Sequence, residues 1–399
     1  MNHFYKIFLA LFLFLNISQI SAQQDTIRKI GFSGIPIVAS SPETGFKYGA
    51  FGQVSFDLYK NNTESRASQF KIGATHSVKN QFSIDTDFFL FGRDESYFII
   101  GTVDYKNWFD RHYGLGNDAG NQIIEHRFDE NATTDTLNYL NYGLNIFITQ
   151  VSYNKKIRKG LFVGAILDYY SSNKFSISAD STEIQNNEII ANDMVGQYLG
   201  LGFNVMYDTR DNINNPSKGA FVQLSNVNYR KWLGGDFEFY TFNLDARKYF
   251  NVVKDQTFAI RMLLASTISD EAIPYSGYQR LGGSKLLRGY FDGTYLDKNV
   301  VAFDAEYRLP LFQDEGAPVY KIWKHLGIVG FVSAGQVFDD AADFGLSEFR
   351  FSAGGGLRIL LNKEQRTNIR LDYGIGFQEN AAGVGRKQRG FYITVNEAF

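Results

Sequence analysis

The side chains that could carry out chemistry are few, and their spacing does not form a known catalytic site. Asp339, Asp340 and Asp343 are close enough in sequence to bind a divalent cation, although a solvated acidic loop is the commoner explanation for such a group. The segment from Ser171 to Lys174 has the spacing of a Ser-x-x-Lys nucleophile, but the motifs that accompany it are absent. The five histidines are scattered, at His3, His76, His112, His126 and His325. We therefore expect no enzymatic activity, no cofactor and no metal site.

A different kind of chemistry is suggested by residues 278–290, which fit neither a strand nor an ordinary turn. Their sequence is Tyr-Gln-Arg-Leu-Gly-Gly-Ser-Lys-Leu-Leu-Arg-Gly-Tyr. An arginine in such a segment can hold carboxylates through charge-assisted and bidentate hydrogen bonds. This is binding chemistry, and it depends on the elements that surround the segment.

The composition indicates a chain of strands and turns. The 399 residues include 38 Gly, 37 Phe and 24 Tyr, but only 6 Pro and no Cys. Without cysteine there is no disulfide framework, so backbone pairing and burial must hold the fold together. The net charge of −2 gives no sign of nucleic-acid binding, and we expect no nucleic-acid partner.

The amino-terminal residues 1–22 have the pattern of a secretory signal peptide. Lys6 precedes the apolar run from Ile7 to Leu15, and the small residues Ser21 and Ala22 follow it. The apolar run is too short for a transmembrane helix, which needs about 20 residues. We therefore predict a signal peptide over 1–22 and one domain over 23–399.

Long stretches of the chain alternate between apolar and polar or very small residues, which is typical of β-strands. One example is the apolar series Leu199, Leu201, Phe203, Val205 and Tyr207. A soluble sandwich also alternates, but the signal peptide, the strands of ten or more residues and the alternating short and long connections favour a transmembrane barrel. The predicted fold is all-β, an antiparallel transmembrane barrel of about sixteen strands. We place the strands at 30–39, 45–59, 66–78, 81–92, 95–106, 141–156, 159–172, 195–208, 219–230, 236–249, 255–268, 298–311, 326–337, 347–361, 366–377 and 388–398.

The connections alternate in length, as they do in outer-membrane barrels with short periplasmic turns and longer external loops. If the first strand starts on the periplasmic side, the long connections 107–140, 173–194 and 269–297 are all external. The segment 278–290 then lies in the sixth external loop.

At this loop the sequence resembles the barrels of the BamA/TamA type, the bacterial surface antigen family of outer-membrane assembly and translocation proteins. The resemblance rests first on Leu281-Gly282-Gly283, on Leu287-Arg288-Gly289-Tyr290, and on the run from Glu306 to Leu311. Further matching pieces lie along the barrel, at 41–45, 113–118, 208–219, 354–358 and 371–374. The resemblance covers the whole barrel in order.

The resemblance implies that the sixth external loop folds into the lumen and that acidic residues on the wall hold Arg288. The phase of the strands places Asp304, Glu306 and Asp372 on the lumen side, so each is a candidate partner. Ser333 occupies the position at which the family usually has the acidic partner of the arginine. We therefore expect Glu306 or Asp372 to be the partner of Arg288. Gly289 would permit the sharp reversal of the loop.

The resemblance also implies a function in inserting or translocating proteins, or lipid, at the outer membrane of a Gram-negative bacterium. The seam between the first and last strands would open laterally, and Pro36 and Gly390 lie in those two strands. The periplasmic polypeptide-transport-associated domains of the best-studied members are not expected here, which would leave client handling to a partner. The expected partners are outer-membrane lipid, client outer-membrane proteins or a periplasmic partner subunit.

Two other functions remain open on the sequence. The chain could be a passive pore or structural barrel that has the fold without the activity, or the barrel subunit of a larger complex.

The carboxyl-terminal residues resemble the signal by which outer-membrane barrels are recognised for insertion. Phe391, Ile393, Val395 and Phe399 are expected to share one lipid-facing phase.

Overall fold

The structure is a computed structural model, and it describes residues 30–41, 45–59, 65–117, 140–177, 194–253, 255–311, 325–363, 366–378 and 388–399. The predicted signal peptide at 1–22 lies outside these residues. Among the described residues no helix is both long enough and apolar enough to cross a membrane.

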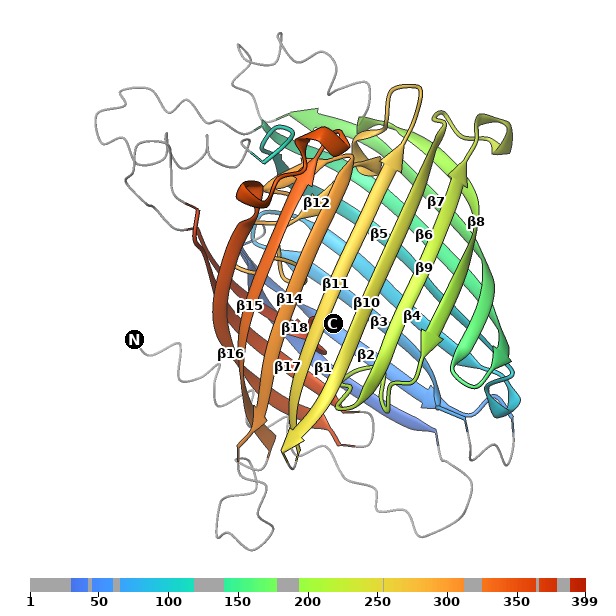
Figure 1. Cartoon of the computed structure of the whole chain (residues 1–399), viewed down its shortest axis with the longest axis vertical. Coiled ribbons are helices and arrows are strands. Elements are labelled where there is room, and N and C mark those ends of the chain that lie inside the picture. The colour runs from blue at the N-terminus through green and yellow to red at the C-terminus, as the bar shows by residue number, and fades with distance from the viewer. Residues whose placement is uncertain are drawn as a thin grey trace, which may run out of the picture.

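Sixteen antiparallel strands form one sheet whose order follows the sequence, which confirms the predicted all-β barrel. Figure 1 shows the strands tilted around a common interior. The strands of the wall are β1 (Gly31–Ser41), β2 (Gly45–Phe56), β3 (Ser68–Ser77), β4 (Phe82–Phe91), β5 (Tyr97–His112), β6 (Leu140–Arg158), β7 (Leu161–Ile177), β8 (Gly196–Asp208), β9 (Gly219–Tyr229), β10 (Phe239–Val253), β11 (Gln256–Ile268), β14 (Asn299–Pro310), β15 (Leu326–Phe338), β16 (Arg350–Asn362), β17 (Thr367–Gly376) and β18 (Arg389–Val395).

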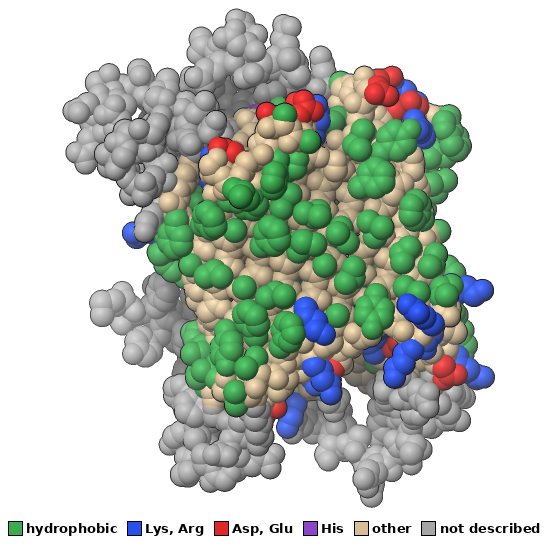
Figure 2. Space-filling view, viewed as in Figure 1, with side chains coloured by type: hydrophobic (Ala, Val, Ile, Leu, Met, Phe, Trp, Pro, Cys, Tyr) green, Lys and Arg blue, Asp and Glu red, His purple; other side chains and the backbone are tan. Residues whose placement is uncertain are grey.

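The alternation in sequence separates an apolar outer face from a polar inner face. On β8, Leu201 and Phe203 are 47% and 52% exposed, whereas the side chain of Asn204 has no exposed surface. Apolar side chains likewise cover much of the outer face seen in Figure 2. This arrangement, apolar outside and polar inside, suits a barrel surrounded by lipid.

Buried apolar clusters lie inside the barrel and leave room for charged groups between them. One cluster, near the short turns, joins five side chains from β4, β5, β7, β8 and β9: Phe91, Phe98, Phe162, Met206 and Phe221. A second, towards the long loops, contains the stacked rings of Tyr170 and Tyr198 and those of Tyr229 and Phe239.

The strands that flank two long external loops extend further than the sequence predicted. β5 continues to His112, β6 begins at Leu140, and β7 continues to Ile177, so the predicted loops 107–140 and 173–194 were too long. The nineteen residues of β6, even at a tilt of about 45°, rise well beyond a lipid belt about 25 Å tall. Above that belt the backbone ladder continues, but an apolar outer face is no longer required.

Candidate functional site

The connection between β11 and β14 folds into the barrel. Its first and last parts, β12 (Gln279–Leu281) and β13 (Tyr295–Asp297), pair as a small antiparallel sheet. The residues between them form the tip that carries Leu287, Arg288, Gly289 and Tyr290. We call residues 278–297 the inner loop.

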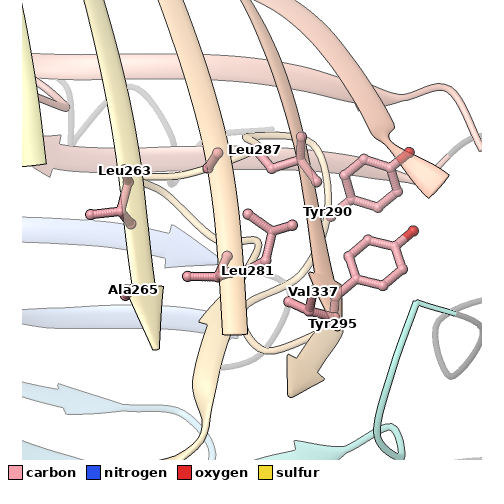
Figure 3. Packing of buried hydrophobic residues seen from close by; sticks show 9 residues of the cluster. Leu263, Ala265, Leu281, Leu287, Tyr290, Tyr295 and Val337 are labelled. Atoms are coloured by element: carbon pink, nitrogen blue, oxygen red, sulfur yellow. The ribbon is translucent and has the colours of Figure 1, made fainter. Parts of the chain in front are cut away.

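An apolar cluster joins the inner loop to the wall. Leu281, Leu287, Tyr290 and Tyr295 have no exposed surface, and they pack with Leu263, Ala265, Val300, Ala302 and Val337 from β11, β14 and β15. Figure 3 shows these side chains gathered between the loop and the strands. Burial of this many apolar side chains helps to hold the loop inside the barrel.

Arg288 is fully buried and lies between two carboxylates of the wall. Its guanidinium forms ion pairs with Glu306 on β14 and with Asp372 on β17, the latter at an Nη1–Oδ2 distance of 2.7 Å. The guanidinium carbon also lies 3.6 Å from the ring centre of Phe331 on β15. Burial would lower the pKa of Arg288, but the nearby carboxylates of Glu306, Asp372 and Asp304 outweigh burial and raise its pKa above the usual value. The charge of this group is therefore permanent.

Of the three predicted acidic candidates, the structure brings two to Arg288. Asp304 is buried on the same strand as Glu306, but it accepts a hydrogen bond of 2.6 Å from the Ser333 hydroxyl and lies opposite that residue in the ladder. Ser333 therefore engages Asp304, while Glu306 and Asp372 hold the arginine.

Glycine allows the loop tip to approach the wall closely. Gly289 has a φ of 122°, and a Cβ atom there would lie 2.7 Å from the backbone of Ile375 on β17. Its N–H donates to the Tyr392 hydroxyl at 3.2 Å. The neighbouring Tyr290 hydroxyl donates to the Phe351 carbonyl and accepts from the N–H of Gln378. The tip is thus fixed to β16, β17 and β18.

The charged cluster continues from Arg288 towards the short turns, through residues that the sequence did not single out. Glu306 also pairs with Arg308 at 2.8 Å, and Asp372 also pairs with Arg358 at 2.6 Å. Arg358 in turn pairs with Glu397 at 2.7 Å. Arg308 lies two positions from Glu306 in the run from Glu306 to Leu311, and Arg358 lies two positions from Gly356 in the piece 354–358. Strand phase combined with these motifs could therefore have identified both arginines.

The carboxyl-terminal residues depart from the prediction. Phe391 is 46% exposed on the outer face, and Ile393 and Val395 share its phase. β18 ends at Val395, and Asn396 adopts a left-handed conformation with a φ of 65°. Phe399 then turns inward, where it is 5% exposed and packs with Tyr249 and Ala259. The expectation that Phe399 faces lipid was wrong, because the chain leaves the strand before reaching it.

The inner loop, its buried arginine and the sixteen-strand wall agree with a match of residues 129–399 to the Omp85 superfamily domain. The chain belongs to the Omp85 superfamily. As an Omp85 barrel it is an outer-membrane protein, in agreement with its apolar outer face. No curated protein matches the sequence at a significant level.

Solved structures resemble this Omp85 chain in fold. BamA from Haemophilus ducreyi, in a crystal structure lacking POTRA domains 1–3, has a TM-score of 0.56 and 13% identity, over 92% of this chain and 70% of that one. CdiB from Acinetobacter baumannii has a TM-score of 0.55 and 14% identity, over 93% of this chain and 60% of that one. CdiB from Escherichia coli has a TM-score of 0.57 and 9% identity, over 94% and 63%. The chain thus spans less than two thirds of either CdiB structure.

Removal of the buried cation should destabilise the barrel. Arg288→Ala would leave Glu306 and Asp372 with less positive charge in a buried site, and we expect a loss of about 3 kcal/mol in the free energy of unfolding in urea. Arg230→Ala is the control, because Arg230 is partly exposed and lies 3.7 Å from Glu238, so its loss should cost less than about 1 kcal/mol. Equal effects of the two changes would contradict the anchoring role of Arg288.

Addition of one methyl group at the loop tip should release the loop. In Gly289→Ala the new Cβ would collide with β17, and we expect trypsin to cleave after Arg288 at least about tenfold faster, because opening of the loop becomes easier by about 1.4 kcal/mol. The peptide that ends at Arg288 can be followed by mass spectrometry. Gly234→Ala is a matched control, since Gly234 has a φ of 99° but no atom within 4 Å of its added Cβ. Similar cleavage after Arg288 in both variants would contradict a specific effect of the close approach at Gly289.

Proposed function

We propose that this barrel assists the insertion or translocation of polypeptides, or of lipid, at the outer membrane by opening between β1 and β18. The proposed partners are outer-membrane lipid, client outer-membrane proteins and a periplasmic partner subunit. The proposed action involves neither catalysis nor a cofactor.

The observation that carries this proposal is the seam between the two ends of the sheet. Within the described ranges every neighbouring pair of strands shares an antiparallel ladder except β1 and β18, which lie side by side. β18 pairs with β17 over only seven residues, and Pro36 in β1 has no N–H to donate. Separation of β1 from β18 would therefore break few backbone hydrogen bonds, whereas separation of any other pair would break a ladder.

The contents of the lumen support this proposal over a passive pore. A barrel of sixteen strands is wide enough for an aqueous channel unless something fills it. Here the inner loop lies inside the wall, and its Arg288 has no exposed surface. Because the inner loop occupies the lumen, the proposed route for a client is through the side of the barrel.

Depletion of the protein tests the proposal in cells. We expect unassembled outer-membrane proteins to accumulate in the periplasm, because clients would lose their route into the membrane. The purified barrel should show low conductance in planar bilayers. Normal assembly after depletion, together with a large conductance that Arg288→Ala leaves unchanged, would instead identify a pore.

A crosslink across the seam tests the proposed opening. The Asn362 amide donates to the Ser33 hydroxyl at 3.1 Å, so this contact joins β16 to β1 past the ends of β17 and β18. The chain has no cysteine, so Ser33→Cys with Asn362→Cys can be bridged by a short thiol crosslinker. Bridging should abolish client insertion, and cleavage of a reducible linker should restore it.

The matched control bridges two strands that already share a ladder. Thr75 and Ser83, on β3 and β4, have hydroxyls 2.9 Å apart. A bridge between cysteines at these positions should leave insertion unchanged. Full activity with the seam bridged would rule out lateral opening.

A further inference from the structure

The outer face of the barrel is hollowed where β10, β11, β14, β15 and β16 run side by side. The hollow has a volume of about 730 Å³, and its lining includes Met262, Phe303, Ala305, Val332, Ala334 and Phe351. These residues alternate along their strands with lumen-facing ones such as Arg261 and Asp304, so the hollow opens towards lipid. Its size falls within the range of roughly 300–1,000 Å³ that small-molecule sites occupy.

The ladder explains the shape of the hollow. Opposed positions across four strands read Met262, Phe303, Ala334 and Phe351, and the next row contains Ile260, Ala305 and Val332. Alanines therefore form the floor between bulky side chains, of which Phe351 and Val332 are 54% and 57% exposed. Beyond Val332 the wall is also bare, because a Cβ added at Gly330 would meet nothing within 4 Å.

A cation lines one side of the hollow. Lys248 faces outward on β10, opposite Ile260, in the half of the strand that leads to the short turns. Its Nζ lies 5.5 Å from the ring centre of Phe250, and Lys248 belongs to none of the ion pairs in the described part of the chain. In Figure 2, several cations lie in the lower half of this face, towards the turns, and others lie along its upper edge. A charge beside lipid is costly unless it reaches the interface or finds a counter-ion.

We propose that this hollow is a binding site for a glycerophospholipid of the periplasmic leaflet. An acyl chain would fill the space above Ala305 and Ala334, and the phosphate would pair with the Lys248 ammonium. Both parts of the site fit one molecule, since Lys248 lies in the same row of the outer face as Ile260 and Ala305.

A second copy of the chain fits the hollow less well. Two identical barrels that met through this face would oppose one concave surface to another and leave a void between them. An acyl chain is thin and flexible, so it can follow a floor of alanine and glycine.

The test measures phospholipid retained by the full-length barrel. Barrel reconstituted in phosphatidylglycerol vesicles is extracted in mild detergent and analysed by native mass spectrometry. We expect a bound phosphatidylglycerol on the unaltered barrel, and about a tenfold loss of that species in Ala305→Phe, in Ala334→Phe and in Lys248→Gln. Diacylglycerol mixed into the same vesicles lacks the phosphate and should be retained about tenfold less than phosphatidylglycerol.

Matched controls lie on the outer face of other strands. Ala165→Phe on β7 and Lys155→Gln on β6 change the same residue types at outward positions away from the hollow, and both should retain lipid like the unaltered barrel. Heat-dependent migration on gels shows that each variant is folded. Equal retention in folded Ala305→Phe and in Ala165→Phe would show that lipid binds the whole outer face without a specific site. That result would overturn the proposal. A dimer that Ala305→Phe dissociates would overturn it in favour of a second copy.

Discussion

A permanent positive charge with no access to water constrains the interior of this barrel. Arg288 lies on a loop, but its two carboxylate partners belong to β14 and β17, which are far apart in the sequence. Each partner also holds a second arginine, and Arg358 extends the cluster to Glu397 beyond the end of β18. Because a buried charge needs several partners at once, the loop, the wall and the carboxyl-terminal residues share one set of interactions. This cluster lies next to the seam at which we propose the barrel opens.

The architecture could be predicted from the sequence because the lipid belt imposes a strict condition on each strand. Every second residue must be apolar over the height of the belt, so the alternation in 199–207 or 369–377 indicates both the strand and its outer face. The ends of β5, β6 and β7 could not be predicted in the same way. Outside the belt the ladder still pairs residues such as Asn107 and Asn145, but no rule of polarity governs their side chains.

The inner site was predicted in part, because strand phase gives the face of a residue and not its height or its neighbours. Strand phase placed Asp304, Glu306 and Asp372 on the lumen side alike. It could not distinguish Asp304 from Glu306, which lie at heights about 7 Å apart along the same strand. The ladder decides between them by setting Ser333 opposite Asp304. The inward turn at Phe399 depends on a single left-handed residue, Asn396, and on contacts with Arg308 that no pattern in the sequence records.

The long sequence separation of the interior contacts has a consequence for how this barrel folds. Arg288 and Asp372 are 84 residues apart, and Lys71 reaches across the lumen to Asn214 over 143 residues. Contacts of this range form late, because the intervening chain must first be confined at an entropic cost. Until the final strands arrive, Arg288 lacks one of its two carboxylate partners, Asp372 on β17. In an incomplete barrel the charge of Arg288 is therefore only partly compensated. Arrival of the last hairpin closes the wall and supplies the Asp372 carboxylate in one step.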